Sequence, residues 1–412
     1  MANEVGTPNG ALRFLMVSTF YPPYHFGGDA VCVHRLSEAL ARRGHEVDVI
    51  HSVDAFRLQH PDDPRLDFRH HPRVQCHGVE SRVPMLSALT AHQLGQPGPY
   101  GAEIRRVIEE RRPDVIHYHN VSLLGGPRIL AEGEAVKLYT SHEYWLVCPT
   151  HVLFRFQREA CTQRTCLACT LHSRRPPQVW RWTGALAESL QHLDRLLCPS
   201  QFTLEQHRRQ GIQVPMEVLP HFVPDAEGTI STPPEPERPF FLFVGRLEKL
   251  KGAQDLIPLF TEELEADLVV VGEGNYGSAL RDLARRCQAS VRFLGARHPR
   301  EIGSLYRQSV ALLAPSLCYE TFGMTVAEAF AQGTPAIVRQ HGALEELITE
   351  SGAGYAFDSS ESCLRAMQRL LGDPQHRAEL GVRAKAMARR RFSEDAHLDR
   401  YLGLVQELRR KR

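Results

Sequence analysis

Two pairs of charged side chains in the second half of the chain have the chemistry to hold a phosphorylated sugar. Glu320 and Glu328 are spaced as E-x7-E, and carboxylates accept hydrogen bonds from sugar hydroxyls well. Arg246 and Lys251 stand upstream in the phrase G-R-L-E-K-L-K-G. A guanidinium offers a planar fork to phosphate oxygens and an ammonium offers a mobile point charge. Together the four residues predict a site for a sugar nucleotide.

The elements around the carboxylates predict a strand, loop, helix and strand in that order. Residues 311–314 read as the end of a buried strand, and Val326, Ala329 and Phe330 recur at helical spacing. Gly333 is placed to end that helix. This order is the plan of a parallel α/β unit.

Loop residues between that strand and the helix lead into a helix N-terminus, where free N–H groups and the helix dipole favour an anion. We expect the N–H groups of four residues to face the phosphates of such a ligand: Thr321, Phe322, Gly323 and Met324. Upstream, residues 240–244 predict a strand with Gly245 at its carboxyl end, where open α/β sheets place ligands. The alternative is that the two carboxylates are ordinary surface and helix-cap residues and that the two loop cations are solvated.

Glycine and histidine residues in the first half follow further predicted strands. Gly27 and Gly28 lie between a strand at residues 12–19 and a helix, so the backbone could approach a ligand closely there. His119 is the second histidine of the strand phrase D-V-I-H-Y-H-N, and His142 follows the strand at residues 136–140. Each feature also has a plain structural explanation, namely a tight turn before the helix and hydrogen-bonded histidines at strand ends.

Four cysteines are bunched as C-x12-C-x4-C-x2-C, at Cys148, Cys161, Cys166 and Cys169. Four thiolates so close in sequence have the count for tetrahedral zinc, and an iron–sulfur cluster also needs four. The alternatives are a loop with free thiols and, less expected inside a cell, disulfides. We expect a structural metal knuckle at the acceptor entrance, with no cofactor needed for catalysis.

Composition limits the class of protein. The chain has 412 residues and a net charge of +1, with 42% hydrophobic and 24% charged residues, which indicates a globular protein of two or three domains. The balanced charge gives no reason to expect a nucleic-acid partner. The polar N-terminus and the lack of a long apolar run predict a cytoplasmic protein. The basic tail at 398–412 and the arginine-bearing helix at 102–112 could touch the inner face of an anionic membrane, although solvated charge is the simpler explanation.

The E-x7-E pair and the upstream G-R-L-x3-K-G together resemble the donor-site signature of the family 4 retaining glycosyltransferases, also called glycosyl transferases group 1. The resemblance extends over nearly the whole chain. The strand phrase ending at His119 is similar to the family's P-D-x-I/V-H-x-H. The phrase at 342–347 departs from the family's G-x-x-E-x-I/V, because Leu344 replaces the usual proline and Leu347 ends it.

The resemblance implies a GT-B fold, in which two doubly wound Rossmann-like α/β domains face each other across a cleft. It places an acceptor-side domain at 1–222 with the cysteine insert at about 148–169, and a nucleotide-sugar domain at 240–395. A proline-rich linker at 224–239 joins them, and a C-terminal helix at 396–412 returns to the first domain.

The resemblance also implies roles for particular residues. Arg246 and Lys251 would neutralise the leaving diphosphate, Glu328 would hold the ribose, and Glu320 and His119 would contact the transferred sugar. The donor is further expected to meet Gly272 and, at the base, Arg297. Gly27, Gly28 and His142 would lie on the acceptor and phosphate side.

The predicted function is therefore transfer of a sugar, with retention, from a UDP or GDP type of donor to a glycan, lipid or small-molecule acceptor. No metal is expected in catalysis, because the protein supplies the cations and no D-x-D motif follows a strand. The alternatives are a GT-B epimerase or phosphorylase, a non-catalytic sugar-nucleotide binder, and a redox protein centred on the cysteines.

Overall fold

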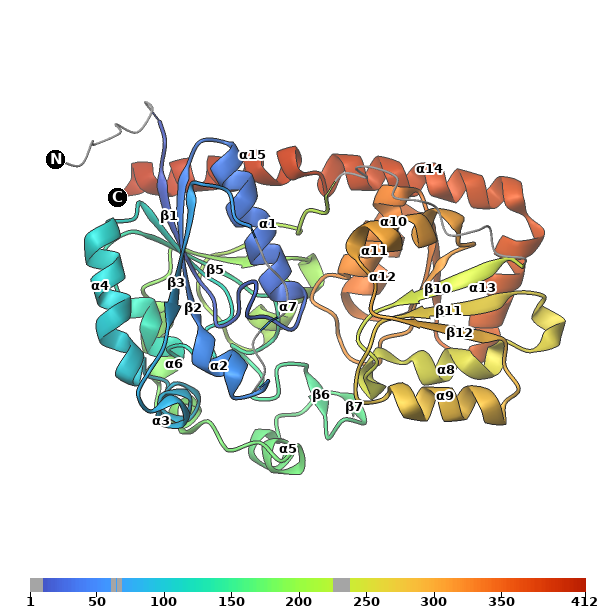
Figure 1. Cartoon of the computed structure of the whole chain (residues 1–412), viewed down its shortest axis with the longest axis horizontal. Coiled ribbons are helices and arrows are strands. Elements are labelled where there is room, and N and C mark those ends of the chain that lie inside the picture. Colours follow the sequence, from blue (N-terminus) through green and yellow to red (C-terminus); the bar gives the residue numbers. More distant parts are fainter. Residues whose placement is uncertain (1–9, 61–63, 65–68, 225–237) are drawn as a thin grey trace.

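The computed structural model of the chain describes residues 10–60, 64, 69–224 and 238–412. Two parallel α/β domains lie side by side, and a pair of long C-terminal helices runs along one edge of both (Figure 1). This arrangement confirms the predicted GT-B class of fold. The greater part of the predicted proline-rich linker, residues 225–237, lies outside the described residues.

The first domain is built on a seven-stranded parallel sheet with the order β3-β2-β1-β4-β5-β8-β9. Its strands are β1 (Arg13–Val17), β2 (Glu46–Ser52), β3 (Val74–Val79), β4 (Val115–Tyr118), β5 (Val136–Thr140), β8 (Arg195–Cys198) and β9 (Met216–Val218). Its main helices are α1 (Gly28–Arg42), α2 (Val53–Arg57), α3 (Pro84–Leu89), α4 (Gly101–Arg111), α6 (Ala185–Leu190) and α7 (Gln201–Arg209).

A small insert lies between β5 and α6, at the lower edge of the first domain in Figure 1. It consists of a hairpin of β6 (Phe154–Arg155) and β7 (Glu159–Ala160), followed by α5 (Cys166–His172).

The second domain has a six-stranded parallel sheet with the order β12-β11-β10-β13-β14-β15. Its strands are β10 (Phe240–Val244), β11 (Asp267–Val271), β12 (Val291–Gly295), β13 (Leu312–Ala314), β14 (Ala336–Arg339) and β15 (Gly354–Phe357). Its helices are α8 (Ala253–Leu256), α9 (Gly277–Arg286), α10 (Pro299–Gln308), α11 (Met324–Gln332), α12 (Gly342–Ser351), α13 (Ser360–Gly372) and α14 (Pro374–Arg391).

Helices cover each sheet on both faces, which explains why strands such as β10 and β13 are continuous apolar runs rather than alternating ones. In β1, Phe14 and Met16 enter one core of the first domain, whereas Leu15 and Val17 enter the core on the opposite face. The second domain repeats this plan, with two cores on the two faces of its sheet. Rigid sheets of this kind fix where the loops at their carboxyl edges lie.

The C-terminal helix α15 (Glu394–Lys411) packs on the first domain, although α14 before it belongs to the second. Leu398, Tyr401 and Val405 enter the same core as Phe14. The hydroxyl of Tyr401 lies 2.9 Å from Nδ1 of His117. The last two helices therefore tie the two domains together from one side (Figure 1).

In two segments the structure differs from what the sequence pattern favours, namely one helix over 179–193 and an exposed connection over 54–73. The helix expected over 179–193 is divided into a 3-10 turn, η4 (Val179–Trp182), and α6, because Gly184 takes a left-handed conformation with φ of 75°. The connection expected to be exposed from residue 54 begins with helix α2, whose Phe56 is buried.

Among the described residues, no helix has both the length and the apolar character that crossing a membrane requires.

Candidate active site

The order of the strands reverses between β10 and β13 in the second sheet, and ligands of open α/β sheets bind at such a point. Lys251 ends the short turn η5 (Lys249–Lys251) after β10, and Glu320 lies in the loop after β13. Lys251 Nζ donates to Glu320 Oε1 at 2.7 Å, and Ser316 Oγ donates to the same oxygen at 2.6 Å. The structure thus joins two of the predicted site residues, which are 69 positions apart in the chain.

A close backbone contact holds the two loops in register. Gly252 has φ of 76°, and a Cβ atom there would lie 2.0 Å from the carbonyl oxygen of Pro315. The N–H of Leu317 donates to the carbonyl of Leu250 at 2.8 Å. Only glycine fits this position without moving the backbone, so the glycine of the G-R-L-x3-K-G phrase sets the distance between Lys251 and Glu320.

The pair is ionised in the free protein. Burial opposes the charge on both groups, but their mutual attraction outweighs it, so the pKa of Glu320 is lowered and the pKa of Lys251 is raised. About a quarter of each side chain remains exposed, at 24% for Lys251 and 23% for Glu320. A ligand can therefore reach both groups.

Arg246 lies at the mouth of the same site. Its side chain is 60% exposed and forms an ion pair with Glu248 at 2.8 Å. An exposed pair of this kind contributes little to stability and is easily exchanged for another anion. The loops behind it cross tightly, since a Cβ atom on Gly272 would lie 1.9 Å from the carbonyl oxygen of Gly245.

Helix α11 presents its N-terminus at this edge of the sheet. Gly323 precedes it with φ of 109°, and no side chain caps the helix. Glu328 on α11 accepts from Arg35 of α1 at 3.2 Å and from the hydroxyl of Tyr306 at 3.4 Å. The predicted ribose ligand is thus engaged by a cation from the other domain.

The loop that carries Glu320 is held by side chains of the first domain. The carbonyl of Thr321 accepts hydrogen bonds from the hydroxyls of Ser200 and Thr203, at 2.7 and 2.9 Å. The hydroxyl of Thr321 donates to the carbonyl of His142 at 2.9 Å. Tyr144 donates to the carbonyl of Glu320 at 3.2 Å. Both domains therefore fix the position of this loop.

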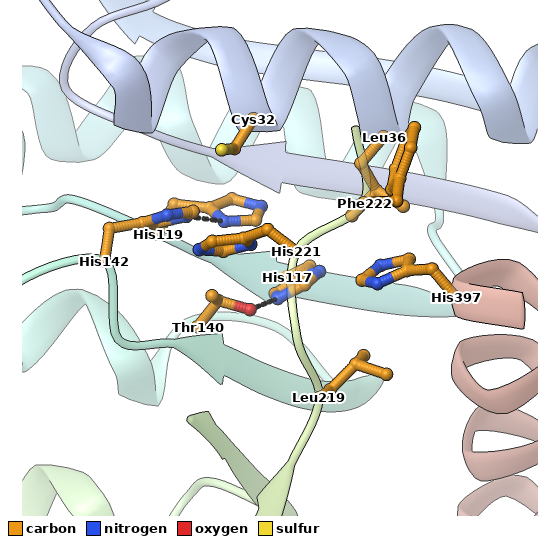
Figure 2. A pocket seen from close by; sticks show the side chains of 10 residues that line it. All are labelled: Cys32, Leu36, His117, His119, Thr140, His142, Leu219, His221, Phe222 and His397. Atoms are coloured by element: carbon orange, nitrogen blue, oxygen red, sulfur yellow. Dashed lines mark hydrogen bonds between the residues drawn. The ribbon is translucent and has the colours of Figure 1, made fainter. Parts of the chain in front are cut away.

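Buried histidines line a small pocket of the first domain below α1 (Figure 2). Nδ1 of His119 lies 2.9 Å from Nε2 of His142, and the ring of His142 stacks on His221 at 4.9 Å. The loop between β13 and α11, residues 315–323, carries Glu320 and is called the donor loop. Its Phe322 contacts the ring of His221 edge-on. The histidine pocket and the donor loop are thus neighbours.

These imidazoles are neutral. Burial lowers the pKa of His142 to about 4 and holds the pKa of His119 well below its ordinary value. Within the part of the chain that the structure describes, Nε2 of His119 is buried without a hydrogen-bond partner. This nitrogen is therefore available to a ligand hydroxyl.

The glycines after β1 leave open space in front of α1. Gly27 is extended, with φ of −156°, so its backbone conformation does not require glycine. An added Cβ on Gly28 would meet no heavy atom within 4 Å. Arg297, which was predicted to meet the base of the donor, is exposed and forms an ion pair with Glu301 at 3.9 Å. It follows β12, which lies two strands from β10 in the sheet.

Several residues that complete the site were not among the predicted set: Arg35, Tyr144, Ser316 and His221. Three of them act across the domain boundary or between distant loops. The local phrases around them carry no chemical pattern, although the phrase L-P-H-F-V contains His221 where the chain leaves the first domain.

Comparison with known proteins identifies the family. Residues 26–227 match the profile described as Glycosyltransferase Family 4, and residues 229–387 match the profile described as Glycosyl transferases group 1. A GDP-mannose-dependent alpha-mannosyltransferase of Mycolicibacterium smegmatis is 28% identical over 390 residues, which cover 92% of this chain and 93% of that protein.

Solved structures share the fold at low sequence identity. Sucrose-phosphate synthase of Thermosynechococcus elongatus superimposes with a TM-score of 0.72 at 19% identity, over 96% of this chain and 99% of that one. HepE of Anabaena, solved in complex with UDP-glucose, gives a TM-score of 0.67 at 16% identity, over 96% of this chain and 100% of that one. The chain belongs to family 4 of the glycosyltransferases and has the GT-B fold.

Proposed function

We propose that this glycosyltransferase moves a hexose from a nucleoside diphosphate sugar to an acceptor hydroxyl with retention at the anomeric carbon. The ion pair between Lys251 and Glu320 at the strand reversal carries the proposal. It puts a cation that can bind the diphosphate next to a carboxylate that can accept from sugar hydroxyls.

The diphosphate becomes more negative as it leaves the sugar, so groups that stabilise it lower the barrier. Lys251 and the exposed Arg246 supply the positive charges, and the uncapped N-terminus of α11 supplies N–H groups. Donor binding exchanges the pairs that these cations make in the free protein for pairs with phosphate oxygens. Because the pair of Arg246 with Glu248 is exposed, its loss costs little.

The remaining polar groups orient the sugar and the ribose. Glu320 accepts from the transferred sugar, and the free Nε2 of His119 meets a sugar hydroxyl from the first domain. Glu328 accepts from the ribose once Arg35 releases it. Retention by attack on the same face as the departing diphosphate rests on the family resemblance.

The kind of donor is proposed from relatives. One similar protein is a GDP-mannose-dependent alpha-mannosyltransferase, and another was solved with UDP-glucose. We therefore propose a UDP or GDP sugar as donor and a glycan, lipid-linked or small-molecule acceptor. A GT-B epimerase or phosphorylase would use the same donor site but would release its product without a sugar acceptor.

The test is turnover of nucleotide sugars with and without a panel of acceptors, followed by proton NMR of the glycoside formed. The proposal predicts nucleotide release that depends on the acceptor, and an anomeric coupling constant that matches the donor's configuration. Product formed without an acceptor would support an epimerase. Product formed only with inorganic phosphate would support a phosphorylase, and an inverted anomer would refute retention.

We also propose that the first domain docks on an anionic membrane, through a face other than the two basic segments. The basic segments are largely neutralised within the protein: Arg106 pairs with Glu103 and Glu110, and Arg409 pairs with Asp114. Large exposed apolar side chains instead gather on two other segments, around α3 and around α5. They are Val83, Met85, Leu86, Leu89 and Leu94, and Leu167, Leu171, Val179 and Trp182.

These two segments meet, because Trp180 Nε1 donates to the carbonyl of His92 at 2.9 Å. Residues 81–98 and 161–187 contain five arginines and no aspartate or glutamate. Exposed apolar side chains beside uncompensated cations fit an anionic lipid surface. We call the nine apolar residues, together with the exposed Arg82, Arg174 and Arg175, the apolar-basic face.

Vesicle sedimentation tests the face. The wild type should bind vesicles that contain phosphatidylglycerol, and it should bind them more weakly at high salt. The double variant Met85→Ser/Leu86→Ser should not bind them. Val382→Ser, which removes a 70% exposed apolar side chain from α14, is the matched control and should bind normally. Equal sedimentation of the wild type and both variants, or none with any lipid, would refute membrane docking.

A further inference from the structure

The cysteine insert has very little apolar support of its own. Its hairpin strands have two residues each and its helix has seven. Of its buried apolar residues, Cys148 and Leu153 join only a small cluster with Tyr144. A segment this small rarely holds one conformation without a disulfide or a bound metal.

The fold of the insert gathers all four cysteines. Cys148, Cys161, Cys166 and Cys169 line one pocket. Cys161 directly follows β7, and Cys166 and Cys169 lie in the first turn of α5. The hairpin thus supplies one thiol, and the start of the helix supplies two, spaced as C-x2-C. This arrangement suits a tetrahedral ion.

The backbone around this pocket is strained in a way that favours thiolates. Eight non-glycine residues with positive φ occur in the described chain, and four of them lie between His151 and Gln157. Each such residue costs about 1–3 kcal/mol, so the local structure must be held by a strong interaction. The turn directs the N–H of Phe156 at Cys169 Sγ, at 3.4 Å. An N–H donor of this kind stabilises a negatively charged sulfur.

Positive charge surrounds the same pocket. Arg155 acts electrostatically on Cys161, and Arg164 and Arg181 act on Cys166. Arg181 is held in place by the carbonyls of Trp145 and Leu146. A divalent ion with four thiolates carries a net charge of −2. Arg155 already pairs with Glu159, so Arg164 and Arg181 would compensate the charge of a filled site.

We propose that Cys148, Cys161, Cys166 and Cys169 bind one structural Zn²⁺ as four thiolates. All four thiols are free in the structure, so no disulfide competes for them. Zinc is preferred to an iron–sulfur cluster because a single ion needs only the small pocket that the insert provides.

Binding must draw the sulfurs together by rotation about the Cα–Cβ bonds. Among the described residues, two other groups already have ligand atoms within 4.8 Å of one another: Cys32 with His142 and His221, and His34 with Glu38 and His70. The first belongs to the candidate active site. In the second, Glu38 already accepts the N–H of His71 and His34 contacts the hydroxyl of Tyr21.

The proposed ion lies behind the donor loop rather than in it. Cys148 shares its small cluster with Tyr144, and Tyr319, the neighbour of Glu320, packs against that cluster. Tyr144 donates to the carbonyl of Glu320. The zinc knuckle therefore supports the loop that carries Glu320, and its loss should loosen that loop without removing the cations of the donor site.

Elemental analysis of the full chain, purified anaerobically without a metal-affinity step, tests the proposal. We expect one zinc per chain in the wild type, none in Cys166→Ser/Cys169→Ser, and one in the control Cys287→Ser, whose thiol lies outside the insert at the end of α9. Well under one equivalent in the wild type, or equal zinc in all three proteins, would overturn the site. Iron with acid-labile sulfide would overturn zinc in favour of a cluster.

A measurement on the wild type alone guards against misfolding of the double variant. Titration of the native protein with a thiol-specific mercurial should release zinc as four thiols react, and the emptied protein should take up Co²⁺ with the visible absorption of a tetrahedral thiolate complex. Release of zinc without reaction of thiols, or Co²⁺ uptake without that absorption, would place the metal elsewhere.

Discussion

Replacing Lys251 with methionine keeps the length and apolar stem of the side chain and removes its charge. In the wild type, Nζ lies 2.7 Å from Glu320 Oε1, at the carboxyl edge of β10. A charged hydrogen bond to a phosphate contributes about 1.5–3 kcal/mol. Since 1.4 kcal/mol corresponds to a factor of ten, the variant should bind the product nucleotide about 10- to 150-fold more weakly.

Turnover should fall further than binding. Lys251 would face charge that develops as the diphosphate departs, and removing one such group costs about 10²- to 10³-fold in kcat. The fold should survive, because Glu320 is partly exposed and keeps the hydroxyl of Ser316. We expect the free energy of unfolding to drop by about 1–2 kcal/mol, between the values for exposed and buried pairs.

Lys249→Met is the matched control, since Lys249 is exposed in the same turn. Isothermal titration with the product nucleotide and initial rates of nucleotide release would be measured for both variants. Glu320→Gln adds a second contrast: it should keep nucleotide affinity, because it frees Lys251, but lose discrimination among sugars. Equal nucleotide affinity in Lys251→Met and wild type, or equal loss in Lys249→Met, would refute the assigned role.

Four other variants test separate parts of the structure. Glu328→Gln should weaken nucleotide binding about tenfold without changing the preferred sugar, as measured by titration, because its proposed partner is the ribose. Gly252→Ala should lower the free energy of unfolding by more than about 2 kcal/mol in urea, because its Cβ would meet the Pro315 carbonyl at φ of 76°. Gly28→Ala, with open space before it, should keep its thermal midpoint but lose turnover, and a lower midpoint would contradict this. Burial lowers the pKa of His397 to about 4. As pH falls below about 6.5, this histidine is therefore protonated in the unfolded chain before it is protonated in the folded protein, and the wild type loses stability. Between pH 7 and pH 5, the free energy of unfolding of His397→Gln should fall by about 2 kcal/mol less than that of the wild type. An unchanged pH dependence of urea unfolding would show that His397 ionises normally.

The sequence predicted the elements of the second domain and the group of residues at its edge for a simple reason. Strand patterns locate the carboxyl ends of β10 and β13, and the loops after them carry Lys251 and Glu320. Because neighbouring parallel strands end at one edge, side chains that follow them must approach each other. The structure adds the reason for Gly252 at the end of the G-R-L-x3-K-G phrase, because a Cβ atom there would meet the carbonyl oxygen of Pro315.

Contacts between the domains could not be predicted from local patterns. Arg35 reaches Glu328, and Glu346 of α12 accepts the N–H groups of Gln201 and Phe202 at the start of α7. Each partner has an ordinary sequence context, and only the packing of the two sheets and α15 brings them together. For the same reason, the stacking of His142 on His221 follows from where the chain leaves the first domain.

Thermal unfolding with a panel of nucleoside diphosphates and nucleotide sugars tests the central claim most directly. A ligand that binds the folded state stabilises it by about 2.7 kcal/mol at a concentration of 100 times Kd. We predict that one nucleotide and its sugar raise the midpoint of the wild type, and that Lys251→Met removes this shift while Lys249→Met keeps it. No shift with any nucleotide, or a shift that Lys251→Met retains in full, would contradict a donor site at the reversal between β10 and β13.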